Sequence, residues 1–431
     1  MNQLATYSLG TVLRETGINA DTLRAWERRY DLPTPERSAG GHRLYSERDL
    51  AIIKWLLLQQ ENGIRIGQAV KIWRSKIAAG EDPLNEAIVP MPNNLLEQSH
   101  LDSFRTQWVA ACIDYDEAKA EQIASQAFTR FSPELSFTEI FLPGIREIGE
   151  LWYQGKVTVQ QEHFASALLM RRLNALISTS PAPTRAEKII VACPPKEEHT
   201  LSSLLLTLFL RRRGFHVVYL GTNVPLEEFQ ETVDVIQPQL VLFTAQLLNT
   251  AATLEQTVRA LANNHVTIGY IGRVFLSTPS IQQYIHGDFL GPSFSDIFAN
   301  IEMILARKEK EVFTLPANPH QELLDSFEVD RAGIHAHLNG ELAQWKFPLK
   351  LLIDATEELS EKIQAALYLG DLDLLLPELV WVKELLKHRN VDASVSLAYF
   401  LRAYAKATHD VMGEKSAQLV DWLEAQSLVY A

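Results

Sequence analysis

Four short apolar runs between residues 188 and 272 constrain the fold of this chain more than any other feature. They are rich in β-branched residues, and segments with helical periodicity separate them. This alternation is typical of β-α-β units, which build a parallel sheet covered by helices on both faces. A weaker run at 288–291 is a candidate fifth strand. The four runs are KIIVACPP (188–195), FHVVYLG (215–221), LVLFTAQ (240–246) and VTIGYIG (266–272).

Helical segments flank this series on both sides. The chain has 431 residues, which is too long for one ordinary domain. Apolar residues recur at helical spacing over 95–180, where Pro133 and Pro143 separate segments short enough for a four-helix bundle. A second apolar-periodic region covers 320–431. We therefore predict a multidomain α and α/β protein in which a parallel sheet domain, at 187–312, lies between two helical bundles.

Cysteine usage and the start of the chain indicate where the protein works. The two cysteines, Cys112 and Cys193, are far apart and show no C-x-x-C spacing, which argues against a zinc site or a disulfide framework and for a reducing compartment. The first residues lack the pattern of an export signal, and no apolar run approaches the ~20 residues of a membrane span. We expect a cytoplasmic protein with no membrane partner.

Charge is distributed unevenly along the chain. The net charge is −13, but residues 1–75 contain 11 Lys and Arg against 8 Asp and Glu and so carry +3. The rest of the chain therefore carries −16. A basic head on an acidic body is the asymmetry expected when only one domain contacts phosphate.

The basic head, residues 1–80, has the pattern of a winged helix-turn-helix domain. Ser8 can cap a first helix, and Asn19 can cap a second over residues 20–30. Arg24 and Arg28 are one turn apart on that second helix, so both can reach one phosphate strand. A Gly-Gly pair then marks the tight turn of a β-ribbon.

This head resembles the MerR family of transcription regulators over roughly residues 6–75, through the order T-L-R-x-W-E-R-R-Y and then G-G-H-R-L-Y-S. The resemblance implies that the second helix enters the major groove, that the ribbon is a wing on the backbone, and that the protein binds double-stranded operator DNA as a dimer. The DNA-contacting residues implied are Arg24, Trp26, Arg28, Arg29, Arg37, Gly41, His42, Arg43 and Tyr45.

A candidate ligand site follows the first strand of the predicted sheet, where ligands of open α/β sheets bind. In this loop, PPKEEHTLSS, His199 lies two residues after Glu197. A carboxylate that holds one ring nitrogen fixes the tautomer and leaves the other nitrogen basic for a metal. No second ligand stands at metal-site spacing, which disfavours a zinc site. A macrocycle that supplies four equatorial nitrogens would need only this one histidine.

Residues 95–308 resemble the helical-bundle cap and flavodoxin-like parallel α/β domain that hold cobalamin in methionine synthase and in MerR-type photoreceptor repressors of the CarH/LitR branch. In that family E/D-x-H-x-x-G supplies the lower axial histidine, and W-x9-E-H covers the upper face. The resemblance therefore implies that His199 is the lower axial ligand of cobalt, with Glu197 and Ser202 in its motif, and that Trp152, Glu162 and His163 lie over the upper face.

Four positions depart from the family pattern. Light-sensing members have a histidine directly after the cap tryptophan, where this chain has Tyr153. A phenol is a poorer neutral-pH ligand than imidazole, which puts a bis-histidine photoproduct in doubt. Around the slot for the nucleotide tail, Ser202, Thr244 and Ile271-Gly272 replace Gly, Ser and Gly-Gly. Another tetrapyrrole, a variant binding mode and a pocket without ligand all stay open, and Thr244 and Gly272 remain cofactor-binding candidates.

These features predict a DNA-binding transcription regulator, a repressor by resemblance. Its oligomeric state, dimer or tetramer, and its operator affinity would depend on cobalamin, with adenosylcobalamin favoured, or on a related tetrapyrrole, with light or metabolite supply as input. The alternative is a ligand-independent MerR-type regulator whose cobalamin-like module serves oligomerisation or partner binding. A cobalamin enzyme would need a substrate barrel, and no span offers eight βα repeats, so we do not expect an enzyme. The extra C-terminal helical bundle could serve dimerisation, partner docking or a second sensory input.

Overall fold

The computed structural model divides the chain into two compact units, Met1–His100 and Leu101–Ala431, and each is described by itself. The predicted Gly40, His42 and the residues that join the head to the cap lie outside the part of the chain that the structure describes. The described residues are 7–16, 18–37, 41, 43–61, 65–78, 95–262, 266–307, 318–342, 349–388 and 393–430.

The N-terminal unit contains two short helices and a small antiparallel sheet. Asn19 begins α2 by accepting a hydrogen bond from the backbone of Asp21, and Asp31 ends it in the left-handed conformation. The three strands pair in the order β1-β3-β2. Two longer helices complete the unit around a core that includes Trp55 and Trp73. The elements are β1 (Tyr7–Ser8), α1 (Leu9–Thr16), α2 (Ala20–Tyr30), β2 (Glu36–Arg37), β3 (Arg43–Tyr45), α3 (Glu47–Glu61) and α4 (Ile66–Ala78).

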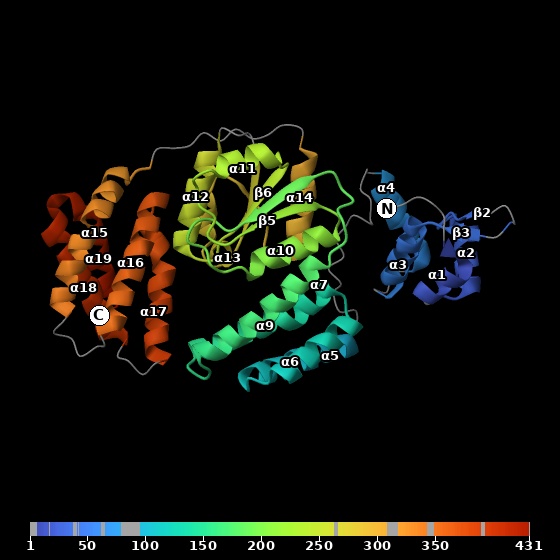
Figure 1. The fold of residues 1–431 in the computed structure, drawn as a ribbon, viewed down its shortest axis with the longest axis horizontal. Helices are drawn as coiled ribbons and strands as arrows, with labels where there is room; N and C mark the ends of the chain where they lie inside the picture. Colours follow the sequence, from blue (N-terminus) through green and yellow to red (C-terminus); the bar gives the residue numbers. More distant parts are fainter. Residues whose placement is uncertain are drawn as a thin grey trace. The chain divides into compact units, whose positions relative to one another are not determined.

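The helices of residues 95–178 form the cap layer (Figure 1). Pro143 does not divide the segment that starts at Pro133, because a π-helical turn directly precedes it and accommodates its missing N–H. Thr158 and Gln161 form a capping box at the start of the last helix. The elements are α5 (Leu95–Ile113), α6 (Glu117–Arg130), α7 (Pro133–Leu135), η1 (Ser136–Phe141), α8 (Leu142–Tyr153) and α9 (Val159–Ser178).

The predicted parallel sheet is confirmed, and its five strands lie in the order β5-β4-β6-β7-β8. Each apolar run forms one strand, and the weaker run at 288–291 supplies the short edge strand. The first strand, β4, has neighbours on both sides, so the loop that follows it emerges near the middle of the sheet. The strands are β4 (Lys188–Ala192), β5 (His216–Gly221), β6 (Leu240–Thr244), β7 (Thr267–Ile271) and β8 (Asp288–Phe289).

Helices cover both faces of this sheet (Figure 1). Phe209 of α10 packs edge-on against Phe294 of α14, and α10 also lies against cap helix α9. On the other side, residues of α11 and α12 share one buried cluster with strands β4 and β6. The helices are α10 (Leu201–Arg212), α11 (Phe229–Ile236), α12 (Leu248–Leu261), α13 (Arg273–Ser277), η3 (Pro279–Tyr284) and α14 (Phe294–Ala306).

The C-terminal bundle packs on the sheet domain through α16, which lies against α12 (Figure 1). Its apolar residues continue the buried cluster of the sheet domain. Among the described residues, no helix is both long enough and apolar enough to cross a membrane. The elements are α15 (Gln321–Leu342), α16 (Leu349–Leu369), η4 (Leu372–Leu375), α17 (Leu376–His388), α18 (Ala393–Met412), η5 (Gly413–Ser416) and α19 (Ala417–Val429).

Candidate functional site

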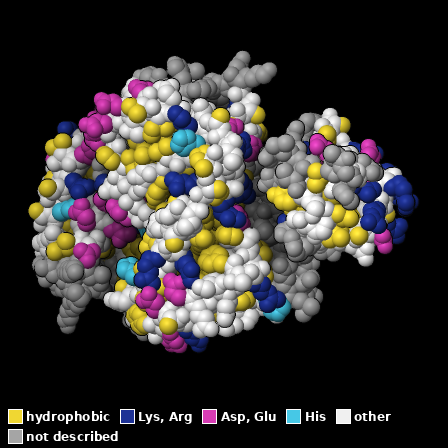
Figure 2. All heavy atoms as spheres, turned by 45° about the vertical axis from the view of Figure 1, so that its right-hand side comes forward, with side chains coloured by type: hydrophobic (Ala, Val, Ile, Leu, Met, Phe, Trp, Pro, Cys, Tyr) yellow, Lys and Arg dark blue, Asp and Glu magenta, His cyan; other side chains and the backbone are white. Residues whose placement is uncertain are grey.

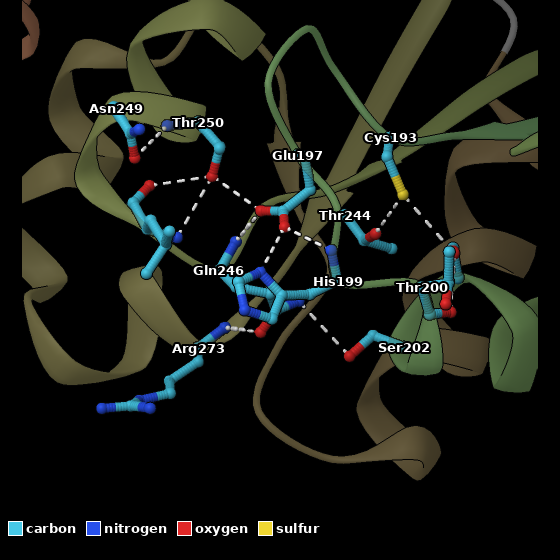
Figure 3. A network of polar contacts seen from close by, with 12 residues as sticks. Cys193, Glu197, His199, Thr200, Ser202, Thr244, Gln246, Asn249, Thr250 and Arg273 are labelled. Carbon is cyan, nitrogen blue, oxygen red and sulfur yellow. Dashed lines mark hydrogen bonds and ion pairs between the residues drawn. The ribbon is translucent and has the colours of Figure 1, made fainter. Parts of the chain in front are cut away.

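The loop after β4 carries a fully buried carboxylate, Glu197, paired with an exposed imidazole (Figure 3). Its Oε1 lies 2.7 Å from Nδ1 of His199 and accepts a hydrogen bond from the His199 backbone at 2.8 Å. Its Oε2 accepts from the backbone N–H of Gln246 at 2.6 Å and from Oγ1 of Thr250 at 2.7 Å. Four donors on two chain segments, the loop after β4 and residues 246–250, therefore fix this one side chain.

These contacts set the charge of the pair. Burial alone would raise the pKa of the Glu197 carboxyl, but its hydrogen bonds from His199, Thr250 and Gln246 outweigh burial and hold the pKa below its usual value. The bond to Glu197 in turn raises the pKa of the imidazole against the opposing effect of burial. The carboxylate thus orients Nδ1 as a donor, while 60% of the His199 side chain is exposed and Nε2 can act as a basic ligand.

The ends of β6 and β7 lie beside this pair, as predicted for ligands at the carboxyl edge of the sheet. Gln246 joins the two sides: its Nε2 donates to Ser202 Oγ at 3.3 Å, and its Oε1 accepts from the backbone of Arg273 at 3.1 Å. Gly272 has a φ of +150°, and a Cβ atom there would lie 1.6 Å from the carbonyl oxygen of Ala245. Only glycine allows this close approach.

Cys193, Ser203 and Thr244 are buried and form a chain of polar contacts that ends at the half-buried Tyr219. Cys193 Sγ lies 3.4 Å from Thr244 Oγ1 and 3.5 Å from Ser203 Oγ, which in turn is 3.3 Å from the hydroxyl of Tyr219. Burial raises the pKa of the Cys193 thiol, so it stays neutral. Thr244 therefore faces this internal chain.

The predicted cap residues lie around the turn between α8 and α9. Glu162 accepts hydrogen bonds from Ser166 at 2.6 Å and contacts Nδ1 of His163 at 2.8 Å. Its charge contributes to the raised pKa of His199, so the cap carboxylate and the loop imidazole share one electrostatic environment. Trp152, at the end of α8, is half-buried.

Tyr153 contacts the C-terminal bundle. Its hydroxyl donates to the carbonyl oxygen of Trp381 at 3.2 Å, and the two rings stack with their centroids 5.8 Å apart. The bundle therefore reaches the cap next to Trp152.

The loop after β4 offers one metal-binding nitrogen, that of His199, which suits a metal ion whose other ligands come from a bound cofactor. Among the described residues, no three His, Cys, Asp or Glu side chains could together hold a metal ion. His199 offers one nitrogen, and the buried Glu197 behind it is the partner that a metal-binding histidine commonly has. A single carboxylate-backed imidazole suits the axial position of a macrocyclic metal complex.

Gln246 and Thr250, which hold the pair, and Asn249, which accepts a hydrogen bond from the Thr250 backbone, were not foreseen from the sequence. Gln246 could have been found from its place directly after a strand, at the edge where ligands bind. Thr250 and Asn249 have no local signal, because they begin a helix about 50 residues after Glu197 and are ordinary helix-start residues.

A second candidate site lies in the N-terminal unit, where α2 presents Arg24, Arg28 and Arg29 to solvent. Figure 2 shows Lys and Arg side chains gathered on one face of this unit. Arg24 forms a surface ion pair with Asp21, at 3.7 Å. Three exposed guanidinium groups on one helix can bind phosphates or base edges.

Two of the predicted DNA-contacting residues pack inside the unit. Trp26 is 4% exposed and Tyr45 is fully buried. The Tyr45 hydroxyl donates to Glu27 at 2.5 Å, and Arg43 Nε donates to the same carboxylate at 2.7 Å. Burial, followed by the Glu27 contact, raises the pKa of Tyr45. Arg43 and Tyr45 therefore fasten β3 to α2, and Trp26 and Tyr45 do not project from the surface.

The wing itself is described only in part. Gly41 is exposed and has a φ of +79°, which a tight turn needs. The side chain of Arg37 and all of His42 lie outside the described residues.

Three family models match successive parts of the chain. The MerR HTH family regulatory protein model covers residues 7–76, and two B12 binding domain models cover residues 105–177 and 187–275. The B12 binding domain model over 105–177 contains Trp152, Glu162 and His163. The model over 187–275 contains β4, Glu197, His199 and β6.

Two curated relatives align with this chain over most of their own length. The HTH-type transcriptional repressor CarH of Myxococcus xanthus is 29% identical over 256 residues, which are 59% of this chain and 84% of the relative. The HTH-type transcriptional repressor CarA of the same organism is 29% identical over 274 residues, 62% of this chain and 87% of the relative. Neither alignment covers this whole chain.

Corrinoid proteins are similar to about half of the chain. Trimethylamine corrinoid protein 1 of Methanosarcina acetivorans is 24% identical over 45% of this chain and 94% of the relative. Among solved structures, the monomethylamine corrinoid protein of Methanosarcina barkeri covers 47% of this chain and 98% of its own, with a TM-score of 0.41 and 16% identity. The matched models show a MerR-type helix-turn-helix domain followed by B12-binding domains, and the two repressors support a DNA-binding transcription regulator rather than an enzyme.

Proposed function

We propose that this protein is a transcriptional repressor whose operator affinity and oligomeric state depend on a bound corrinoid, with adenosylcobalamin as the preferred form. The observation that carries the proposal is the carboxylate-backed imidazole of Glu197 and His199 in a B12-binding domain of a MerR-type chain. Control of this kind requires only that the ligand favours one assembly over another.

His199 would hold the corrinoid through Nε2, and Glu197, Gln246 and Thr250 would keep the imidazole in place. When bound, a corrinoid would supply a cobalt ion, and His199 would be its protein ligand. Trp152, Glu162 and His163 would cover the upper side. Glu162 supports this assignment because its charge acts on His199.

The proposed division of labour follows four domains. The head at 1–80 binds the operator as part of a dimer or tetramer, and Arg24, Arg28 and Arg29 contact the DNA. The wing residues Arg37, Gly41 and His42 would contact the sugar-phosphate backbone of the DNA. The cap at 95–180 and the sheet domain at 187–312 hold the corrinoid. The bundle at 320–431 supports that site.

We propose ligand occupancy as the primary input. The contact between Tyr153 and Trp381 commits the phenol to the bundle, so Tyr153 does not stand in for the second axial histidine of light-sensing members. Light sensitivity would come from the adenosyl form itself, and a dark-to-light comparison tests it.

The experiment uses the full chain and adenosylcobalamin. The purified protein is incubated with the compound in the dark, desalted, and examined by absorption spectroscopy and by size-exclusion chromatography before and after illumination. DNA selected from a random pool then reports operator affinity. We expect a coloured protein whose size and DNA affinity differ from those of the ligand-free chain, and a His199→Ala variant that loses the colour. A colourless wild-type protein would refute corrinoid binding.

A ligand-independent regulator is the second candidate function. The buried chain of Cys193, Thr244, Ser203 and Tyr219 favours it, because these groups pack against one another where an open slot for a nucleotide tail would be expected. Operator binding that is identical with and without adenosylcobalamin would support this candidate.

A further inference from the structure

The C-terminal bundle and the sheet domain share one hydrophobic core. Leu359 and Ile363 of α16 belong to the same buried cluster as Leu254 of α12. The hydroxyl of Tyr284 adds a polar contact, donating to Asp371 at 2.9 Å. Separating the two parts would expose this apolar surface to water, which is costly. The bundle is therefore a firm support on the sheet domain.

Glu361 extends from this support to the loop after β4. Its Oε1 lies 2.9 Å from Nζ of Lys196, and its Oε2 accepts a hydrogen bond from Nδ2 of Asn249 at 3.3 Å. Lys196 directly precedes Glu197, and Asn249 directly precedes Thr250, which donates to Glu197. One carboxylate thus joins the two chain segments that hold the buried Glu197.

The same bundle contacts the cap through α17. The Trp381 ring stacks on the Tyr153 ring, and the backbone carbonyl of Trp381 accepts a hydrogen bond from the Tyr153 hydroxyl. The imidazole of His388 packs edge-on against the Tyr153 ring, with the ring centroids 5.2 Å apart. Tyr153 is the neighbour of Trp152 at the end of α8. The bundle therefore reaches both halves of the candidate corrinoid site, the cap end and the histidine loop.

We propose that the C-terminal bundle is a brace that fixes the cap and the His199 loop relative to each other, with Glu361 and Trp381 as its positioning residues. The inference rests on the proposed corrinoid function. A brace that already orders both halves reduces the ordering cost that binding must overcome, so it strengthens binding without touching the ligand. This gives the segment beyond the matched B12-binding domains a role within the site.

The loop end of the brace is tested with Glu361→Gln, which removes the charge that pairs with Lys196 and keeps the side-chain size. Affinity for hydroxocobalamin is measured by absorption titration of the full chain. We expect binding weaker by about 3- to 10-fold, the range of a partly exposed ion pair and one hydrogen bond. Glu424→Gln, an exposed carboxylate of α19, is the matched control. Equal affinities of the two variants would overturn the brace.

The cap end is tested with Tyr153→Phe, which keeps the ring and loses the bond to Trp381. Tyr115→Phe is its control, since Tyr115 is an exposed cap tyrosine in another turn. We expect hydroxocobalamin to bind about 2- to 10-fold more weakly to the first variant only. In the double variant with Glu361→Gln, the fold-loss of hydroxocobalamin affinity should be smaller than the product of the two single fold-losses. Once one end of the bundle no longer holds its half of the site, the contact at the other end no longer fixes the two halves relative to each other. A full product would mean two independent local contacts and would overturn the proposal.

Hydrogen–deuterium exchange separates failure of the brace from failure of corrinoid binding. In the ligand-free chain, Tyr153→Phe should speed exchange at residues 150–157, and Glu361→Gln should speed it at 196–199. If the wild-type chain does not bind hydroxocobalamin, the proposed function fails, while faster exchange still supports the brace. Exchange at the wild-type rate in both variants would overturn the brace whatever the ligand does.

Discussion

Arg43 Nε lies 2.7 Å from Oε2 of Glu27, and this ion pair fastens strand β3 of the wing to helix α2. The hydroxyl of Tyr45 reaches the other oxygen of the same carboxylate. Only 9% of the Glu27 side chain is exposed, so the pair is shielded from solvent. The spacing between the wing and the helix that carries the exposed arginines thus depends on a single acidic residue.

Replacing Glu27 with Gln should loosen the wing. The variant loses the charge that holds Arg43, and a shielded ion pair contributes more than a surface pair. We expect operator affinity to fall about tenfold while its dependence on salt changes little, because Arg24, Arg28 and Arg29 are all retained. Affinity is measured by fluorescence anisotropy over a range of salt concentrations. Wild-type affinity in this variant would show that the pair does not position the wing.

An Arg24→Ala variant should behave differently. A guanidinium that neutralises one phosphate releases about one counterion, so its loss should weaken binding and lower the salt slope by about one. The same titration measures both quantities. Lys71→Ala removes an exposed cation of α4 and serves as the control. An unchanged slope would remove Arg24 from the phosphate contacts.

A Glu197→Gln variant should lose corrinoid affinity even though Glu197 does not touch the ligand. The uncharged amide holds the imidazole of His199 less strongly, and the loss of such a supporting partner typically costs about 10- to 100-fold in metal affinity. Glu198→Gln changes the exposed neighbouring carboxylate and should bind normally. Absorption titration with hydroxocobalamin compares the two, and equal affinities would argue that the buried carboxylate is only structural.

Gly272→Ala should destabilise the sheet domain. The added Cβ would clash with the Ala245 carbonyl at 1.6 Å, so the ends of β6 and β7 must separate. Severe steric conflicts of this kind reach about 3–5 kcal/mol. Gly149→Ala lies in α8 with nothing within 4 Å, and alanine should stabilise that helix by about 0.5–1 kcal/mol. Denaturant unfolding measures both, and a Gly272→Ala protein as stable as the wild type would contradict the clash.

His335 should make the stability of the C-terminal bundle depend on pH. Burial lowers the pKa of its imidazole, and Arg331 also lowers it against the opposing effect of Glu357. The unfolded chain therefore takes up a proton more readily than the folded one, and stability is lost as pH falls through the ordinary histidine value of about 6.5. A His335→Gln variant should lose less stability between pH 7 and pH 5.5 than the wild type. His409 is an exposed histidine of the same bundle, and His409→Gln should lose as much stability as the wild type over this pH range. Urea unfolding at each pH measures the free energy of unfolding of both variants.

Local patterns in the sequence were sufficient to predict most helices and strands and to find the helix-turn-helix and Glu197–His199 motifs. The strand runs and the Asn19 cap depend on residues that are neighbours in the chain, and so do Glu197 and His199, which are two positions apart. Pro143 shows the limit of such reasoning, because a π-helical turn keeps the helical segment continuous where the proline predicts a break.

Only the tertiary structure decided which distant residues surround the pair. Thr250 is 53 positions from Glu197, and Trp381 is 228 positions from Tyr153. Tyr45 carries the signature of a DNA-contacting wing residue, yet the packing of β3 on α2 buries it. The physical reason is the same in each case: periodicity and capping are properties of adjacent residues, whereas burial and long-range contacts depend on how the elements pack, which local sequence does not encode.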